Sequence, residues 1–250
     1  SLNLAQAFVH AGGRRILGCG SCFEYDWRQG ICVEDLTPLV PATLYGTAKH
    51  ALHVALTGLT KQAGISLAWA RPFFLYGGDE HPTRLVAAVA SALVEGRPAE
   101  TSHGRQIRDY LHVADVAEGL AALCLSEAEG DFNIASGQAL SLREIIMEIA
   151  AQVGRPDLVR LGARAAQAYE PPIIVGDPAK TCDVIGWQAR IDLKTGVAMT
   201  LGWAFGGEAL GPRTFAAAAV VLAAVALITT APPATRAVVA PAGAVPARQG

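Results

Sequence analysis

The sequence predicts an α/β protein, because segments with helical spacing of apolar residues alternate with short strand-like runs. Residues 2–10 are apolar at helical spacing, and Ala11-Gly12-Gly13 ends that helix. A buried strand is expected over 15–21, a long helix over 48–63 and a second strand over 66–70. With 250 residues the chain can bury a full core, so we expect one α/β domain with a small additional lobe.

The net charge argues against nucleic acid as a partner, and the cysteine content indicates a reducing compartment. The net charge is −2 at pH 7, which leaves no basic surface of the kind that binds nucleic acid. The 5 cysteines are an odd number, and the first residues do not resemble a secretory signal. We therefore expect reduced thiols and a cytoplasmic protein.

Cys19 and Cys22 have the spacing of a redox dithiol. A thioredoxin-type pair starts at a helix N-terminus, whereas this pair follows a strand and precedes Glu24 and Asp26, whose carboxylates would raise the thiol pKa. We interpret the pair as buried small residues and keep a dithiol protein as a minor hypothesis. With no second cysteine pair or histidine cluster nearby, no metal site is predicted.

Tyr45 and Lys49 are the first candidates for chemistry. In a helix they stand at positions i and i+4, so the phenol and the ammonium can point into the same space. A free tyrosine has a pKa of about 10, and a nearby cation favours the phenolate, which suits proton transfer to a carbonyl. The same spacing arises by chance in many helices, so the pair alone does not decide the function.

Ser21 lies at the end of the 15–21 strand, four residues before Tyr25. A strand-end serine followed by Tyr-x-x-x-Lys, here Tyr45 to Lys49, resembles the extended short-chain dehydrogenase/reductases, a family of nucleotide-sugar epimerases, dehydratases and ketoreductases. The resemblance implies a Rossmann-like parallel sheet with a small C-terminal substrate lobe, and NAD or NADP as cofactor. It also implies that Ser21, Tyr45 and Lys49 are catalytic.

The resemblance assigns a role to each of these side chains. Tyr45 would move the hydroxyl proton, Ser21 would hydrogen-bond the same oxygen, and Lys49 would lower the pKa of Tyr45 while holding the nicotinamide ribose. Residues 71–77 resemble the family's loop between nicotinamide and sugar. The expected cofactor-binding residues are Tyr45, Lys49, Pro72 and Phe73.

A second group is expected to hold a nucleotide-diphosphate sugar. Segment 104–117 closely resembles the family's Arg-Asp-Tyr/Phe-x-His/Tyr-Val-x-Asp-Val/Leu-Ala signature, which makes Arg108 a bidentate ligand of the diphosphate. Arg84 lies in the first turn of a helix expected over 82–93, where a bound phosphate would offset the unfavourable helix dipole. Glu170 lies where the family often has a ribose-contacting acid, and a solvated loop glutamate is the alternative.

Cap signals place the later elements. Asp115 is expected to be the N-cap of a helix over 116–125, and His112 to be an interior residue. Segment 141–153 opens with a Ser-x-x-Glu capping box and predicts an amphipathic helix. We expect Arg71 to be a structural ion-pair partner.

Departures from the family pattern limit these expectations. The family's Gly-x-x-Gly-x-x-Gly turn, which holds the dinucleotide pyrophosphate at a helix N-terminus, does not occur in these 250 residues. The resemblance therefore implies a truncated copy in which the N-terminal βαβ units are absent. Phe23 stands where the dehydratases have an acid and some epimerases a cysteine, which favours plain 4-keto reduction or 4-epimerisation. Phe74 replaces an asparagine that commonly contacts the sugar nucleotide.

The expected domain organisation has three parts. Residues 1–80 would be the C-terminal part of a Rossmann-type NAD(P)-binding domain, and 81–205 a substrate-binding lobe interleaved with the last Rossmann elements. Residues 206–250 would form an apolar helix and a low-complexity tail. The apolar run 215–228 has 14 residues and extends at most to 231, whereas a spanning helix needs about 20. A membrane anchor, a docked helix and an unstructured extension stay open.

Two main hypotheses on function follow. The first is an NAD(P)-dependent nucleotide-sugar epimerase or 4-ketoreductase, which transfers hydride at a sugar carbinol carbon. The second is a catalytically silent fragment that binds sugar nucleotides and that the tail could tether to a membrane. By analogy with the family we expect a homodimer in which the helix of Tyr45 packs against its mate.

Overall fold

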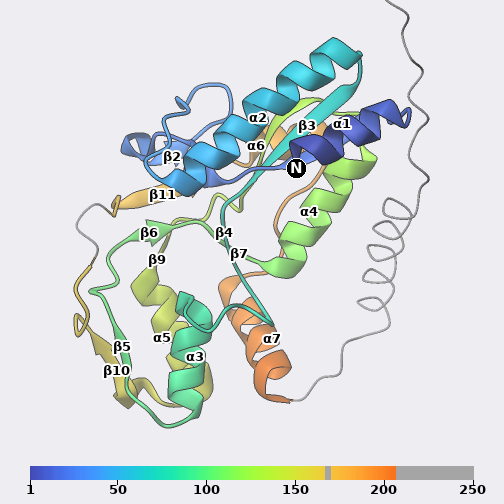
Figure 1. Cartoon of the computed structure of the whole chain (residues 1–250). Coiled ribbons are helices and arrows are strands. Elements are labelled where there is room, and N and C mark those ends of the chain that lie inside the picture. The colour runs from blue at the N-terminus through green and yellow to red at the C-terminus, as the bar shows by residue number, and fades with distance from the viewer. Residues whose placement is uncertain (167–169, 207–250) are drawn as a thin grey trace, which may run out of the picture. The chain divides into compact units, whose positions relative to one another are not determined.

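A computed structural model describes residues 1–166 and 170–206 (Figure 1). The predicted features of the tail, including the apolar run 215–231, lie outside the described residues. The elements in chain order are α1 (Leu2–His10), β1 (Arg15–Cys19), η1 (Cys22–Glu24), η2 (Trp27–Gln29), β2 (Ile31–Cys32), α2 (Leu44–Ala63), β3 (Ser66–Pro72), β4 (Phe74–Tyr76), α3 (Leu85–Val94), β5 (Ala99–Thr101), β6 (Ile107–Arg108), β7 (Tyr110–His112), α4 (Val113–Leu125), β8 (Gly130–Ile134), β9 (Leu140–Ser141), α5 (Leu142–Val153), η3 (Pro156–Leu158), β10 (Val159–Leu161), β11 (Ile173–Gly176), α6 (Ala179–Ile185) and α7 (Leu193–Gly206).

The central sheet is 3-stranded and parallel, in the order β1-β3-β8. Ile16 of β1 pairs with Leu67 of β3, and Ala70 of β3 pairs with Phe132 of β8. The alternation of helices with parallel strands confirms the predicted α/β class. Among the described strands β1 has a neighbour on one edge only, so its other edge is unpaired there.

Helices α1 and α2 contact each other, and α2 packs on β3. Trp69 of β3 is fully buried and forms a small core with Leu56 of α2 and Ala5 of α1. The indole lies over Gly18 of β1, where an added Cβ would stand 2.2 Å from the ring. Glycine at this position therefore lets a large side chain cover the sheet.

A second core lies at the other end of the described unit. Figure 1 shows α3, α5 and α7 gathered there, away from α1 and α2. Val89 and Leu93 of α3, Ile145 and Ile149 of α5 and Val197 of α7 are all buried in one cluster. The burial of this second core holds α3 firmly against α5 and α7.

Strand β6 brings the 104–117 segment into a mixed sheet of order β2-β11-β6-β9. Arg108 of β6 pairs with Ile174 of β11 and with Leu140 of β9. Asp109, which follows, is fully buried and accepts hydrogen bonds from the amides of Ser136, Gly137 and Gly176. The position of Arg108 is thus fixed from both sides.

Three helix starts differ from the prediction. Helix α3 begins at Leu85 rather than at 82, so Arg84 is its N-cap residue and does not lie in its first turn. Helix α2 begins at Leu44 rather than at 48, because the Thr43 side chain accepts a hydrogen bond from the Gly46 amide. Asp115 is not an N-cap: His112 caps α4, with Nδ1 accepting from the Ala114 amide at 3.2 Å. The predicted capping box at the start of α5 is confirmed.

None of the helices in the described part of the chain is long and apolar enough to cross a membrane.

Candidate functional site

Tyr45 and Lys49 lie in the first turns of α2, and Tyr45 is 53% exposed. The Lys49 ammonium lies 5.7 Å from the centroid of the Tyr45 ring. The same ammonium donates a hydrogen bond to the Cys19 carbonyl oxygen, at 2.8 Å. The helix therefore places the predicted phenol and cation together at the C-terminal end of β1.

Ser21 follows β1 and is the N-cap of η1. Its Oγ accepts from the Phe23 amide at 3.3 Å, and its own amide donates to the Glu24 carboxylate at 2.9 Å. The Phe23 carbonyl lies against Gly46 of α2, where an added Cβ would stand 2.1 Å from the oxygen. Because Lys49 contacts Cys19 and Gly46 contacts Phe23, the structure holds the Ser21 segment against the start of α2 from both sides.

Glu24 is a fully buried acid that no motif in the sequence marks as part of the site. Besides the Ser21 amide, its carboxylate accepts from Trp69 Nε1 at 3.1 Å and from Arg71 Nε at 3.2 Å. Arg71, also fully buried, pairs with Asp131 at 3.0 Å. Arg71 thus has the structural ion-pair role expected for it, and Glu24 links the Ser21 turn to the sheet.

Glu24, His50 and His53 bring potential metal ligands within 4.8 Å of one another. The Arg71 guanidinium lies 3.2 Å from Glu24 and 3.3 Å from His53 Nδ1. A fixed positive charge in contact with these groups opposes a second cation. We therefore assign the cluster to the ion-pair network.

The interpretation of the cysteine pair as buried is wrong for Cys19, which is exposed, and right for Cys22. Cys19 is the last residue of β1, at a strand position that faces away from the core. Burial raises the pKa of the Cys22 thiol, whereas a reactive dithiol needs a lowered one. The environment of Cys22 thus disfavours the dithiol hypothesis.

Pro72 and Phe73, at the end of β3, are both buried. The Phe73 ring centroid lies 6.5 Å from that of Tyr25, inside the main core. Its amide donates to the Ile134 carbonyl at 3.1 Å. The structure therefore leaves the side chain of Phe73 in the core, away from the exposed Tyr45.

Arg108 and Glu170, both predicted to bind substrate, contact each other. Arg108 is 2% exposed, and its Nη2 lies 3.0 Å from the Glu170 carboxylate. Gln106 donates to the other oxygen of Glu170 at 2.8 Å. Burial lowers the pKa of Arg108, and the charge of Glu170 partly offsets this effect.

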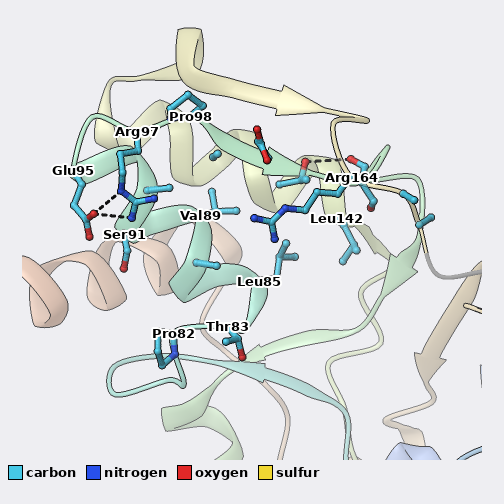
Figure 2. A pocket seen from close by; sticks show the side chains of 18 of the residues that line it. Pro82, Thr83, Leu85, Val89, Ser91, Glu95, Arg97, Pro98, Leu142 and Arg164 are labelled. Atoms are coloured by element: carbon cyan, nitrogen blue, oxygen red, sulfur yellow. Dashed lines mark hydrogen bonds and ion pairs between the residues drawn. The ribbon is translucent and has the colours of Figure 1, made fainter.

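Glu170 lines a pocket of about 540 Å³ between α3, strand β5 and residues 164–166 (Figure 2). Arg164, which the sequence analysis missed, extends its guanidinium toward Leu85 and Val89 of α3 in Figure 2. Arg84 is the N-cap residue of α3 and pairs with Glu80 at 3.5 Å. Its neighbours Thr83 and Leu85 line the pocket, so all three predicted substrate residues lie in or beside it.

Aromatic rings connect the two groups of residues. The Phe23 centroid lies 5.7 Å from that of Tyr45 and 5.9 Å from that of Phe74. The Arg108 guanidinium carbon lies 5.5 Å from the Phe74 centroid. A row of neighbouring side chains therefore runs from the catalytic candidate Tyr45 to the substrate-binding candidate Arg108.

The fold and this site define an α/β protein with a Ser, Tyr and Lys set at a strand end and, beyond it, a pocket whose lining includes Arg164 and Glu170. The chain belongs to the NAD dependent epimerase/dehydratase family, whose model matches residues 1–135. This membership confirms the resemblance on which the assignment of Ser21, Tyr45 and Lys49 rests, while the roles of these residues stay predictions.

Relatives in this family have related activities. The chain is 24% identical over 212 residues to UDP-glucose 4-epimerase of Lacticaseibacillus casei, covering 76% of this chain and 63% of that protein. It is 27% identical over 213 residues to the enzyme of the same name from Mycolicibacterium smegmatis, covering 80% of this chain and 66% of the relative. The chain thus spans less than two thirds of the length of these curated relatives.

Solved structures share the fold. MoeE5 in complex with UDP-glucuronic acid and NAD superposes with a TM-score of 0.72 and 28% identity, over 81% of this chain and 68% of that one. The same protein has been solved with UDP-glucose and NAD. UDP-glucose 4-epimerase of Thermus thermophilus with NAD gives a TM-score of 0.73 at 24% identity, over 83% of this chain and 69% of that one. These neighbours support a Rossmann-type sheet.

Proposed function

We propose that the chain acts as an NAD(P)-dependent nucleotide-sugar epimerase or 4-ketoreductase that transfers hydride at a sugar carbinol carbon. One observation carries this proposal: the Tyr45 and Lys49 pair, held against the Ser21 turn, is continuous through Phe23 and Phe74 with the Arg108 and Glu170 pair. A sugar between these two ends would have its reacting carbon at Tyr45 and its diphosphate at Arg108.

In this proposal the chain's own residues move one proton. Tyr45, beside the Lys49 ammonium, exchanges a proton with the sugar hydroxyl. Ser21 hydrogen-bonds the same oxygen and stabilises the charge that develops on it. The Phe23 ring stands edge-on to the Tyr45 ring and covers one side of it. The reverse transfer returns the proton when hydride comes back to the carbonyl carbon.

The residues around Tyr45 fit the nicotinamide end of a dinucleotide. Tyr45 is exposed, and the Lys49 ammonium has donors beyond the one that bonds Cys19. NAD(P), when bound, would accept the hydride and return it. Pro72 and Phe73 are proposed to contact it only through backbone atoms, because their side chains are buried. These 250 residues contain no glycine turn for the pyrophosphate.

The pocket lined by Glu170 is the proposed nucleotide site. A guanidinium grips a diphosphate bidentately, so Arg108 is proposed to exchange part of its pairing with Glu170 for phosphate oxygens. The Glu170 side chain is 27% exposed, so its carboxylate can then accept a hydrogen bond from a ribose hydroxyl. Arg84 and Arg164 would add positive charge at the pocket entrance. The UDP-sugar ligands of the structural neighbours support this substrate class.

Assembly and location are proposed from the surface of α1 and α2 and from the thiols. We infer a homodimer through α1 and α2, whose exposed Leu4, Phe8, Leu44 and Val54 give these helices an apolar surface. The five free thiols favour a reducing compartment, and we propose the cytoplasm.

A turnover assay tests the proposed function. The protein is incubated with UDP-glucose or UDP-galactose and NAD⁺, and the sugar nucleotides are separated by chromatography. Interconversion that disappears in Tyr45→Phe supports the epimerase. Binding of UDP-glucose by calorimetry without conversion, and without any affinity for NAD(P), supports the second candidate instead, a silent sugar-nucleotide module, which the missing glycine turn favours.

A further inference from the structure

The Glu24 carboxylate lies buried directly behind the Ser21 turn. Its Oε1 accepts a hydrogen bond from the Ser21 amide at 2.9 Å. Its other two donors, Trp69 Nε1 and Arg71 Nε, both belong to β3. Donors on two different elements hold the carboxylate in one place, so the oxygen that accepts from Ser21 is fixed relative to the sheet.

The glycine before Ser21 makes this close approach possible. A Cβ on Gly20 would stand 2.1 Å from Glu24 Oε1 and 2.4 Å from Trp69 Nε1. Only a residue without a side chain therefore lets the carboxylate reach the amide of the next residue. The Gly20 amide itself donates to the Ala70 carbonyl at 2.7 Å, so the chain enters Ser21 from a peptide group that is already hydrogen-bonded to β3.

The same turn determines which part of the Ser21 hydroxyl stays free. The Phe23 amide donates to Ser21 Oγ at 3.3 Å, and the Glu24 amide donates to the Ser21 carbonyl at 3.1 Å. A hydroxyl has one proton to donate and two lone pairs that accept. Because the Phe23 amide occupies a lone pair, the hydroxyl proton is left for another acceptor. The turn thus prepares Ser21 to donate to an oxygen on which negative charge develops.

We propose that Glu24 is a positioning residue for the proton transfer, because its carboxylate holds the Ser21 turn in the form in which the hydroxyl donates to the reacting sugar oxygen. This inference rests on the proposed function and adds to it a residue that touches neither the sugar nor the cofactor. Since Glu24 acts through Ser21, loss of its contact should lower kcat and leave the affinity for the sugar nucleotide, which depends on Arg108, unchanged.

Two variants of Glu24 test the inference in a turnover assay with UDP-glucose and NAD⁺. Glu24→Asp keeps the charge beside Arg71 but shortens the reach to the Ser21 amide. Glu24→Gln keeps the length but leaves one oxygen for three donors. Each variant should lower kcat about tenfold, the loss expected for one hydrogen bond to a charged group, and should change KM by less than about twofold.

A double-mutant cycle with Ser21→Ala shows whether the effect passes through Ser21. In the Ser21→Ala background, Glu24→Asp and Glu24→Gln should change kcat by less than about twofold, because no hydroxyl remains to be positioned. Equal losses of kcat with and without the Ser21 hydroxyl would overturn the inference. Unchanged kcat in both folded single variants would overturn it as well, while wild-type turnover would still support the proposed function.

Glu34→Asp is the matched control. Glu34 is a second buried acid, whose carboxylate accepts from the Asn133 amide at 2.7 Å. Its substitution shortens a buried side chain in the same way and should keep the wild-type kcat. Thermal melting of all variants separates a loss of stability, which a purely structural role of Glu24 predicts, from the loss of kcat in a folded protein.

The Ser21 amide proton provides a readout that does not require turnover. Hydrogen exchange followed by NMR should find this amide protected in the wild type and exchanging at least about tenfold faster in Glu24→Asp. A rapidly exchanging Ser21 amide in the wild type would overturn the inference even if both Glu24 variants fail to fold. Absence of turnover in the wild type would instead overturn the proposed function, and the catalytic role of the Glu24 contact with it.

Discussion

The Arg108 guanidinium and the Glu170 carboxylate lie 3.0 Å apart, although 62 residues separate them in the chain. Arg108 is almost fully buried on β6, whereas Glu170 lines the pocket. The pair holds a cation in place at the edge of a cavity. In the proposed function, phosphate oxygens would take the place of the Glu170 carboxylate on the guanidinium.

Arg108→Ala should weaken UDP binding by about 10- to 100-fold, the loss expected for one or two charge-assisted hydrogen bonds. Calorimetry at constant ionic strength gives the value. Arg105→Ala is the matched control, because Arg105 is exposed in the same segment and its substitution removes the same charge. Equal losses in both variants would show a general charge effect and would contradict a specific contact to Arg108.

Tyr45→Phe should lower turnover of UDP-glucose by about 10²- to 10⁴-fold, because the variant lacks the group that carries the proton. Lys49→Ala should lower both turnover and cofactor affinity. Lys61→Ala, which removes an exposed lysine from the last turn of the same helix, should leave both unchanged. Wild-type turnover in Tyr45→Phe would show that the phenol does not carry the proton.

Gly46→Ala and Gly58→Ala compare two glycines of α2. A Cβ at Gly46 would stand 2.1 Å from the Phe23 carbonyl oxygen, whereas one at Gly58 would meet nothing within 4 Å. Gly46→Ala should therefore reduce the free energy of unfolding by about 2 kcal/mol through overpacking, and lower the melting temperature by about 5 °C. Gly58→Ala should raise stability by about 1 kcal/mol through helix propensity. Similar changes in both would contradict the close contact between α2 and the Ser21 turn.

The pattern of the sequence predicts most of the scaffold, because the signals are local. Helix α1 has the predicted bounds, and the capping box at Ser141 starts α5 as expected. The predicted start of α2 is four residues too late, because its cap, Thr43, lies in a segment that reads as a polar loop. Periodicity alone cannot reveal a cap whose first turn contains a glycine.

Contacts between distant segments account for what the sequence did not predict. Asp115 accepts from the amides of Arg190 and Ile191, which lie 75 and 76 residues away, so a capping rule could not reveal its role. The buried Glu24 carboxylate finds its hydrogen-bond donors in Trp69 and Arg71 on β3, which lie far from it in the sequence. The contact of Phe23 with Phe74 likewise depends on the tertiary fold.

The Asp131 carboxylate gives a prediction about pH. Burial alone would raise its pKa, but the hydrogen bond from His53 and the charge of Arg71 outweigh burial and lower it. Its stabilising contribution is therefore complete above the ordinary carboxyl pKa of about 4, and is lost as the pH falls through the lower value of the folded state.

Asp131→Asn should consequently lower the free energy of unfolding by about 3 kcal/mol at pH 7, because it leaves the buried Arg71 with one acidic partner fewer. Denaturant unfolding at several pH values measures the difference, which should shrink below about pH 4. Asp35→Asn, at a carboxylate that is 72% exposed, is the control and should change stability little. A pH-independent difference would contradict the ion-pair role.

Binding of NADH and NADPH to the 250-residue protein, followed by nicotinamide fluorescence, tests the central claim most directly. We expect micromolar to submillimolar binding that Lys49→Ala weakens by at least about tenfold and Lys61→Ala leaves unchanged, since the loss of a charge-assisted hydrogen bond has that size. Absence of binding at millimolar concentrations of both cofactors would contradict the claim that this chain performs hydride transfer, and would leave it a module that binds nucleotide sugars.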